Sequence, residues 1–303
     1  MPDENINFKK PDFIRLNYKF NELSSRSQNY IKDVLKLVNC KIGLNHIYSI
    51  ILFGSQIFKN KEYTSISDCD LLIVLDNQTP KRRINELERY LFTLEIKHKY
   101  REKNLKFLRR ILSYVQYSTG MFVSHFITKR KYCEEAVFHK IFRVNKAFSY
   151  LFTPRKIVLN SIISNHKELY GKPLHKIIKK SLIPKQFEIL KSLMMNLIIS
   201  FFSIGISPLK KLNAIKYQLE AVKWSLKTSN YYIFRDSKSL KKITLRLSLD
   251  KKFKLKTKEI LYFKKFLQLR EKPQNNLRFM LKSPFKILQI HIKAFNFKLL
   301  SSK

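Results

Sequence analysis

Apolar residues divide the chain into a mixed first part and a helical second part. Short runs rich in branched side chains at residues 47–54, 69–76 and 121–128 predict three buried strands. In residues 12–48 and 79–120, apolar side chains recur three and four positions apart, as they do in amphipathic helices. This mixture predicts a small sheet with helices packed on its faces.

The pattern changes near residue 170. The stretch "ELYGKPL", residues 168–174, contains glycine and proline and predicts a connection. Beyond it the apolar spacing is almost wholly helical, in the segments 185–206, 208–230, 236–248, 256–270 and 283–301. We therefore expect the α+β class, with one domain over residues 1–175 and an all-α domain over residues 176–303.

Positive charge is concentrated in the helical part. The formal net charge is +39; residues 1–173 hold 31 Lys and Arg against 16 Asp and Glu, and residues 174–303 hold 30 against 6. Such a basic surface favours a polyanionic partner such as RNA, because binding releases counterions from the phosphates. Biased composition, rich in Lys, Ile, Asn and Phe with only 5 Gly, explains the same excess equally well.

Cysteine usage and hydropathy indicate a cytoplasmic protein. The three cysteines have no CxxC spacing, which argues against a zinc site or a disulfide framework: Cys40, Cys69 and Cys133. The polar N-terminal stretch does not resemble a signal peptide. Residues 190–207 are apolar but contain Lys191 and Asn196, and they lie at the short limit for a membrane span. We interpret them as a buried helix and expect no stable membrane insertion.

Two short motifs carry the candidate chemistry. Gly54 and Ser55 end the first predicted strand, and Asp68 and Asp70 begin the second. Two carboxylates two positions apart on a strand point to the same side of the sheet, so Cys69 between them points the other way, into the core.

These residue types suit the binding of a nucleoside triphosphate. Gly54 lets the backbone approach a ligand, and Ser55 adds a hydroxyl beside N–H groups that favour phosphate. The carboxylates of Asp68 and Asp70 repel each other unless a cation lies between them, and Mg²⁺, or Mn²⁺, is a hard cation that takes such oxygens. The sequence therefore predicts a phosphate cradle beside a metal clamp.

The spacing resembles a known signature. A hydrophobic-Gly-Ser motif followed by Asp-x-Asp after twelve residues looks like that of the polymerase-β-type nucleotidyltransferase superfamily, and "FGSQIFKNKEYTSISDCDLLIV" is similar to its stand-alone NTP-transferase domain. Residues 119–132, 151–174 and 216–226 resemble an uncharacterised branch of it. The resemblance implies transfer of a nucleoside monophosphate from an NTP, with ATP the first candidate, to a hydroxyl. It makes Asp68 and Asp70 the catalytic metal ligands.

The superfamily commonly adds a third carboxylate on a later strand. Here the predicted strand 121–128 carries Ser124 and His125 instead, and His125 is interpreted as a core histidine. Other acids are available as alternatives, namely Glu62, Asp76, Glu95 and Glu134. Glu95 is a candidate general base toward the acceptor hydroxyl, against the simpler interpretation of a solvated helix face.

Further cations are candidates for phosphate contacts. The helical stretch 216–226 places four side chains on one side: Tyr217, Glu220, Lys223 and Trp224. Lys216 or Lys223 could reach the triphosphate; the simpler interpretation is an amphipathic face with Trp224 in the core. The basic residues 81–83 are expected near the active-site side, where they meet phosphate or solvate a helix start.

Three hypotheses from different classes follow. The first is a Mg²⁺-dependent nucleotidyltransferase whose acceptor is a small molecule, a protein hydroxyl or an RNA 3′ end. The second is a catalytically weak or inactive protein of the same fold that binds nucleotide or RNA through its basic helical domain. The third is a peripheral membrane protein, which depends on residues 190–207 and on the basic amphipathic tail 285–300.

Overall fold

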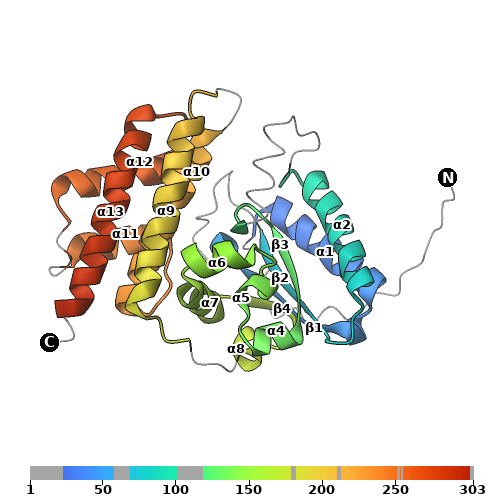
Figure 1. Cartoon of the computed structure of the whole chain (residues 1–303). Helices are drawn as coiled ribbons and strands as arrows, with labels where there is room; N and C mark the ends of the chain where they lie inside the picture. The colour runs from blue at the N-terminus through green and yellow to red at the C-terminus, as the bar shows by residue number, and fades with distance from the viewer. Residues whose placement is uncertain are drawn as a thin grey trace.

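A four-stranded mixed sheet organises the first part of the chain (Figure 1). The strand order is β3-β2-β1-β4; β1 pairs antiparallel with β2 and β4, and β2 pairs parallel with β3. The strands are β1 Ile47–Phe53, β2 Asp70–Leu75, β3 His125–Lys129 and β4 Lys167–Gly171. The computed structural model describes residues 23–57, 69–101, 119–178, 182–209, 213–250, 253 and 255–300.

Both faces of the sheet are covered by helices, because alternate strand residues are apolar on each side. Leu71 and Ile73 of β2 pack toward two long helices, α1 Ser25–Ile42 and α2 Lys81–Lys97. Leu72 and Val74 pack toward the shorter helices on the other face. These are α4 Arg130–Glu134, α5 Phe138–Ile141, α7 Arg155–Ser164 and α8 Leu174–Ile177, with α6 Lys146–Phe152 between them in the chain.

The described part of the predicted helices and strands is largely confirmed, with shifted bounds. Helix α1 ends at Ile42 because Gly43 adopts φ +85°, a left-handed conformation that terminates helices. The third strand begins at His125 rather than at residue 121, because residues 120–122 form a turn in which Gly120 and Phe122 have positive φ. The second half of the predicted helical segment 79–120 lies outside the described residues.

The connection predicted over residues 168–174 is wrong, since Lys167–Gly171 forms the edge strand β4. Only Leu169 of this strand is buried. Its charged side chains and the glycine that ends it are typical of an edge strand, where one side of the backbone remains without a neighbour. The strand exists because β1 offers it a pairing partner, and that partner lies more than a hundred residues earlier.

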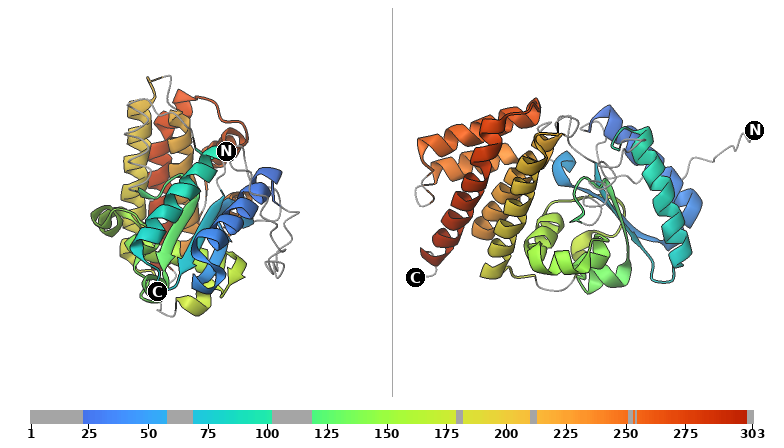
Figure 2. Two further views of the ribbon diagram at one scale, coloured as in Figure 1. Left: turned by 90° about the vertical axis from the view of Figure 1, so that its right-hand side faces the viewer. Right: turned by 45° about the horizontal axis from the view of Figure 1, so that its top comes forward.

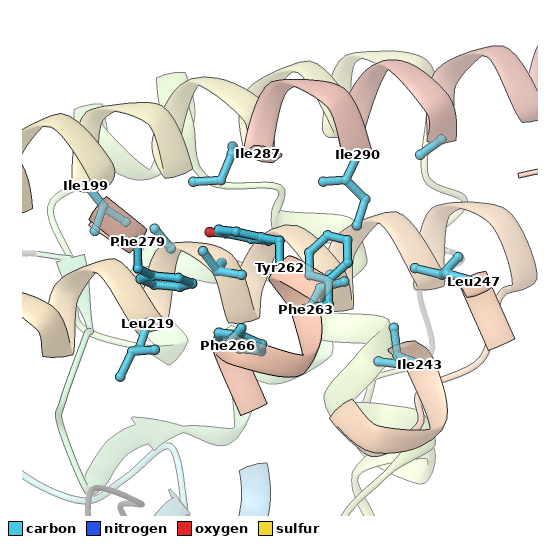
Figure 3. Close-up of a cluster of buried hydrophobic side chains, with 14 of the residues drawn as sticks. Ile199, Leu219, Ile243, Leu247, Tyr262, Phe263, Phe266, Phe279, Ile287 and Ile290 are labelled. Atoms are coloured by element: carbon cyan, nitrogen blue, oxygen red, sulfur yellow. The ribbon is translucent and has the colours of Figure 1, made fainter. Parts of the chain in front are cut away.

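The second part of the chain is a helical bundle, as predicted (Figures 1 and 2). Its helices are α9 Gln186–Ile206, α10 Ala214–Phe234, α11 Leu240–Leu249, α12 Thr257–Glu271 and α13 Leu277–Leu300. Aromatic residues fill its core (Figure 3). The rings of Tyr262 and Phe279 stack with their centroids 4.9 Å apart, and Tyr262 Oη lies 2.6 Å from Ser283 Oγ.

Helix α7 connects the two parts. Its Ile157 belongs to the hydrophobic cluster of the bundle, whereas Leu159 and Ile162 belong to the cluster on the sheet. Side chains of one short helix therefore enter both cores. The division of the chain at residue 175 stays a prediction.

Helix α9 is apolar around most of its surface and has small polar side chains at its most buried positions. Four of its side chains are fully buried, and all are polar: Ser192, Asn196, Ser200 and Ser203. Among the described helices it is the one long and apolar enough to cross a membrane, by length and composition alone, and 33% of its most apolar window is buried. Core helices of soluble proteins pass the same test. The helix belongs to the bundle as expected: Ile189 and Ile199 lie in its core and other apolar side chains of α9 pack against it, although five apolar side chains of the helix are exposed, namely Phe187, Leu190, Met194, Ile198 and Phe201.

Candidate functional site

The end of β1 and the start of β2 meet at one edge of the sheet. In the antiparallel register Phe53, the last residue of β1, is opposite Asp70, the first residue of β2. Gly54 follows with φ +83° and opens a 3-10 turn, Gly54–Ile57, that contains Ser55. The two predicted motifs are therefore adjacent in space, although eleven residues between them lie outside the described residues.

Asp70 packs directly against the backbone of Gly54. A Cβ atom added to Gly54 would collide with Oδ2 of Asp70 and would lie 2.9 Å from its Cγ. Position 54 therefore requires glycine for two reasons: its φ lies in the left-handed region, and the space that a side chain needs is filled by a carboxylate. We call Gly54 and Ser55 the glycine bend.

Of the three residues in the Asp-x-Asp motif, the structure describes Cys69 and Asp70. Cys69 is completely buried in the cluster beneath α1 and α2, as predicted from the alternation along the strand. Asp70 is half-buried at the mouth of a cleft. Asp68 lies outside the described residues, so its place beside Asp70 stays a prediction.

The cleft lies between the sheet edge and the helical bundle. Gly54, Ser55 and Asp70 form one side of it, and residues 119–122 also line it. The opposite side carries side chains of α10 and α12: Glu220, Lys223, Trp224, Lys227 and Arg270. We call Lys223, Lys227 and Arg270 the cationic wall. The cleft thus brings a carboxylate on the sheet edge opposite a group of cations, which is a suitable arrangement for a metal–phosphate ligand.

Helix α10 contributes more side chains to the cleft than its sequence predicts. Lys223 lines the cleft, whereas Lys216 lies over the ring of Phe122, 4.1 Å from its centroid, and does not. Trp224 is half-buried and lines the cleft, so the interpretation that it belongs to the core is wrong. Tyr217, expected on the same side, is buried in the core cluster instead.

Two residues of the cationic wall were missed. Lys227 lies one helical turn beyond Lys223, which was the available sequence signal. Arg270 comes from α12 and had no local signal, because its approach to α10 depends on the packing of the bundle.

Buried charges on this wall are strongly coupled. Glu220 accepts a hydrogen bond from Nη1 of Arg270 (3.2 Å) and forms an ion pair with Lys223. Burial alone would raise the pKa of Glu220, but the two cations lower it to about 2. Burial, with repulsion from Lys223 and Arg270, lowers the pKa of Lys227 to about 8, while Glu220 and Asp70 act in the opposite direction. An anionic ligand would therefore relieve repulsion among the cations.

The pairing of Glu220 with two cations makes the free energy of unfolding depend on pH. Because the folded-state pKa lies below the ordinary value of 4.5, its contribution of about 3 kcal/mol is complete above pH 4.5 and is lost as the pH falls toward 2. We expect Glu220→Gln to lower the free energy of unfolding by about 3 kcal/mol at pH 7. Urea titrations at a series of pH values should show the difference from wild type shrinking below pH 4.5. A difference that does not change with pH would contradict this assignment.

Glu95 is neither solvated nor in the cleft. It is 1% exposed, and its carboxylate accepts hydrogen bonds from the backbone N–H of Ser124 (3.0 Å), Nδ1 of His125 (2.8 Å) and Nε of Arg101 (2.8 Å). Burial would raise the pKa of Glu95, but His125 and Arg101 hold it below its usual value. The expected solvated helix face is wrong. The alternative role as a general base lacks support, because Glu95 is not among the cleft residues.

Glu95 instead fixes the start of β3 next to Asp70. Leu71 N donates to the carbonyl of Ser124 (3.0 Å), and Leu71 is paired with His125. We expect Glu95→Ala to cost about 3 kcal/mol of stability, since it leaves buried polar groups unpaired. Glu86→Ala removes an exposed carboxylate from the same helix, and chemical denaturation should show a loss below about 1 kcal/mol. Equal losses in the two variants would contradict the role of Glu95.

No third carboxylate joins Asp70 within the described residues. The parallel register of β2 and β3 begins at Leu71 and His125, so the residue beside Asp70 is Ser124, which directly precedes β3 and is buried. Asp76 and Glu134 lie toward the opposite end of the sheet, and Glu62 is outside the described residues. Residues 81–83, expected near the active-site side, begin α2 after that same opposite end of β2, and none lines the cleft. Across the described ranges, no group of three His, Cys, Asp or Glu residues could hold a metal ion.

Comparison with known proteins identifies the fold. No protein-family model and no curated protein sequence matches the chain. Among solved structures it is similar to the spectinomycin adenyltransferase AAD(9) from Enterococcus faecialis, crystallised with ATP and spectinomycin. The TM-score is 0.52 at 10% identity, over 89% of this chain and 99% of that chain. The chain thus has a nucleotidyltransferase fold with a helical domain, which confirms the predicted α+β class.

Proposed function

We propose that the protein is a nucleotidyltransferase that moves a nucleoside monophosphate from an NTP to a hydroxyl acceptor. The observation that carries this proposal is the contact between Asp70 and Gly54 at the mouth of a cleft whose opposite side is the cationic wall. An acid at a glycine turn is common in proteins. An acid and a turn that share a cleft with three clustered cations, within this fold, suit a metal-bound triphosphate.

The residues of the chain take separate roles in this proposal. The glycine bend exposes backbone N–H groups and the Ser55 hydroxyl to phosphate oxygens. Lys223 and Lys227 balance the negative charge of the phosphates from the other side, and Trp224 offers a ring face to a base or an acceptor. With its pKa near 2, Glu220 is a poor general base, so we assign it to holding Lys223 and Arg270 in place.

A divalent cation fits the donor set. The carboxylate of Asp70 is a hard oxygen donor at the edge of the cleft, and Asp68 would supply a second one; Mg²⁺ or Mn²⁺ takes such ligands. When bound, the ion neutralises phosphate charge and polarises the phosphorus for attack by a hydroxyl.

ATP is the first nucleotide to test. The similar solved structure holds ATP, which supports an adenine nucleotide for a cleft formed by the same fold. Its other ligand, spectinomycin, is not carried over, and the acceptor is proposed only as a hydroxyl compound. An RNA acceptor stays a prediction from net charge alone.

A second candidate is a nucleotide-binding protein of this fold with weak or no turnover. The observation that favours it is Ser124, which directly precedes β3 beside Asp70, where a third acid of the kind common in the superfamily is expected. A serine hydroxyl is a weaker metal ligand than a carboxylate. The two candidates differ in one measurable quantity, the release of pyrophosphate.

Incubation with each α-labelled NTP, Mg²⁺ and separate cellular RNA, protein and metabolite fractions distinguishes these candidates. We expect label transfer and pyrophosphate release with one acceptor fraction, and neither in the Asp68→Ala/Asp70→Ala variant. Transfer that persists in the double variant would refute the site. Tight ATP binding without pyrophosphate release in any fraction would favour the second candidate.

Lys227 should set the affinity for the nucleotide. Lys227→Ala removes a cation of the cationic wall, and we expect it to weaken ATP binding about tenfold or more, because charge-assisted contacts to phosphate are among the stronger hydrogen bonds. Isothermal titration with Mg·ATP measures the effect. Lys216→Ala is the control, since Lys216 lies on the same helix outside the cleft; equal effects of the two substitutions would contradict the assignment.

A further inference from the structure

The outer side of the helical bundle carries an apolar surface in a strongly basic molecule. On α9 the exposed apolar side chains recur at helical spacing: Phe187, Leu190, Met194, Ile198 and Phe201. On α13 the exposed apolar residues are Leu277, Leu281, Phe285, Leu288, Ile292 and Leu299. We call these two sets the outer stripes. Exposed apolar surface of this extent on neighbouring helices is unusual in a soluble monomer and marks an interaction site.

The two outer stripes belong to one side of the bundle. Helices α9 and α13 lie side by side, and α10 packs against both of them (Figures 1 and 2). Side chains that point outward from α9 and α13 therefore point away from α10.

A buried polar seam holds α9 in this orientation. Gln218 Nε2 of α10 donates to Ser200 Oγ (2.7 Å), and Ser203 Oγ donates to the carbonyl of Ala214 (2.7 Å). On the α13 side, Ser192 Oγ lies 3.0 Å from Nε2 of His291. Turning the apolar side inward would break these hydrogen bonds and leave their partners on α10 and α13 unpaired in the interior. The outward direction of the apolar side chains is thus built into the packing.

The charged side chains of the two helices that carry the outer stripes are positive, apart from one buried acid. Helix α13 contains no acidic residue. Of its five cations, Lys293 pairs with Glu259 of α12 (2.7 Å), and the other four are Arg278, Lys282, Lys286 and Lys298. Glu188, the one acid of α9, is buried and accepts a hydrogen bond from the backbone N–H of Lys156 (2.8 Å). A partner for this side must therefore combine negative charge with an apolar interior.

We propose that the outer stripes dock the protein peripherally on an anionic lipid bilayer. Lipid headgroups would pair with the lysines while the phenylalanine and leucine side chains enter the boundary with the acyl chains. A second copy of this chain fits less well, because it would bring a net charge of +39 against the same charge. RNA matches the cations but leaves the apolar side chains in water. The polar seam keeps α9 within the bundle, so the docking does not span the membrane.

Flotation of the full chain with lipid vesicles tests the proposal. We expect binding to vesicles of phosphatidylcholine with 30% phosphatidylglycerol, little binding to phosphatidylcholine alone, and a decrease in high salt. Phe187→Gln/Phe201→Gln/Phe285→Gln should lower the bound fraction about tenfold or more, since each loses an apolar group that would enter the bilayer.

The control is a triple substitution outside the outer stripes with matched exposure. Leu245, Leu249 and Leu261 are 60%, 72% and 59% exposed on α11 and α12, against 67%, 60% and 69% for Phe187, Phe201 and Phe285. The Leu→Gln triple variant should bind vesicles as wild type does. The proposal is overturned if wild type does not float with anionic vesicles, or if the phenylalanine variant floats equally well. It is also overturned if light scattering shows a dimer that the phenylalanine substitutions dissociate and vesicles do not bind.

Discussion

Asp70→Asn should lower the rate of nucleotidyl transfer by at least about a hundredfold while the chain remains folded. The substitution keeps the shape of the side chain against Gly54 but removes the negative charge that attracts a divalent cation. Pyrophosphate release with Mg·ATP in excess, together with the acceptor fraction identified by labelling, measures the effect. Circular dichroism and the urea midpoint check that the fold is retained.

Asp76→Asn is the matched control for this experiment. Asp76 follows the last residue of the same strand, whereas Asp70 is its first residue, and Asp76 does not line the cleft. We expect its rate to stay within about threefold of wild type, as for surface substitutions in general. Comparable losses in the two variants would indicate a general effect of charge on the strand and would remove Asp70 from the site.

Gly54→Ala should abolish most activity and destabilise the protein as well. The new methyl group meets the Asp70 carboxylate, so either the acid or the glycine bend must move, and the left-handed φ adds strain of about 1 kcal/mol. We expect a total loss of about 2–4 kcal/mol in the free energy of unfolding and at least about a hundredfold in transfer rate. Denaturant titration and pyrophosphate release give the two values.

Gly43→Ala separates backbone strain from the collision with Asp70. Gly43 has nearly the same φ, +85°, but an added Cβ there meets nothing within 4 Å. This variant should therefore lose about 1 kcal/mol and keep its activity. If both glycine variants lost the same stability and activity, the close contact with Asp70 would not explain the requirement for glycine at position 54.

The elements that the sequence predicts well are those whose signals are local. The strand pair that holds Gly54 and Asp70 follows from two apolar runs and two short motifs, and antiparallel pairing brings their ends together. The helices of the bundle follow from three- and four-residue spacing. In these segments local pattern and tertiary packing favour the same structure.

Features that depend on distant partners were missed. Strand β4 has one buried residue and exists because β1 pairs with it. Glu95 looks like a surface acid until β3 places Ser124 and His125 against it, and Arg270 reaches Glu220 only through the packing of α12 on α10. The exposed apolar side chains of α9 escaped prediction because hydropathy averages over the helix and does not indicate which side is inside.

The two sides of the cleft are far apart in the sequence, since Gly54 and Asp70 precede Lys223, Lys227 and Arg270 by about 150 residues or more. During synthesis the ribosome therefore completes the sheet edge long before it releases α12. A nascent or truncated chain that ends ahead of α10 would contain the signature motif and yet lack every cation of the opposite side. The proposed nucleotide site is therefore complete only after α12 has been synthesised.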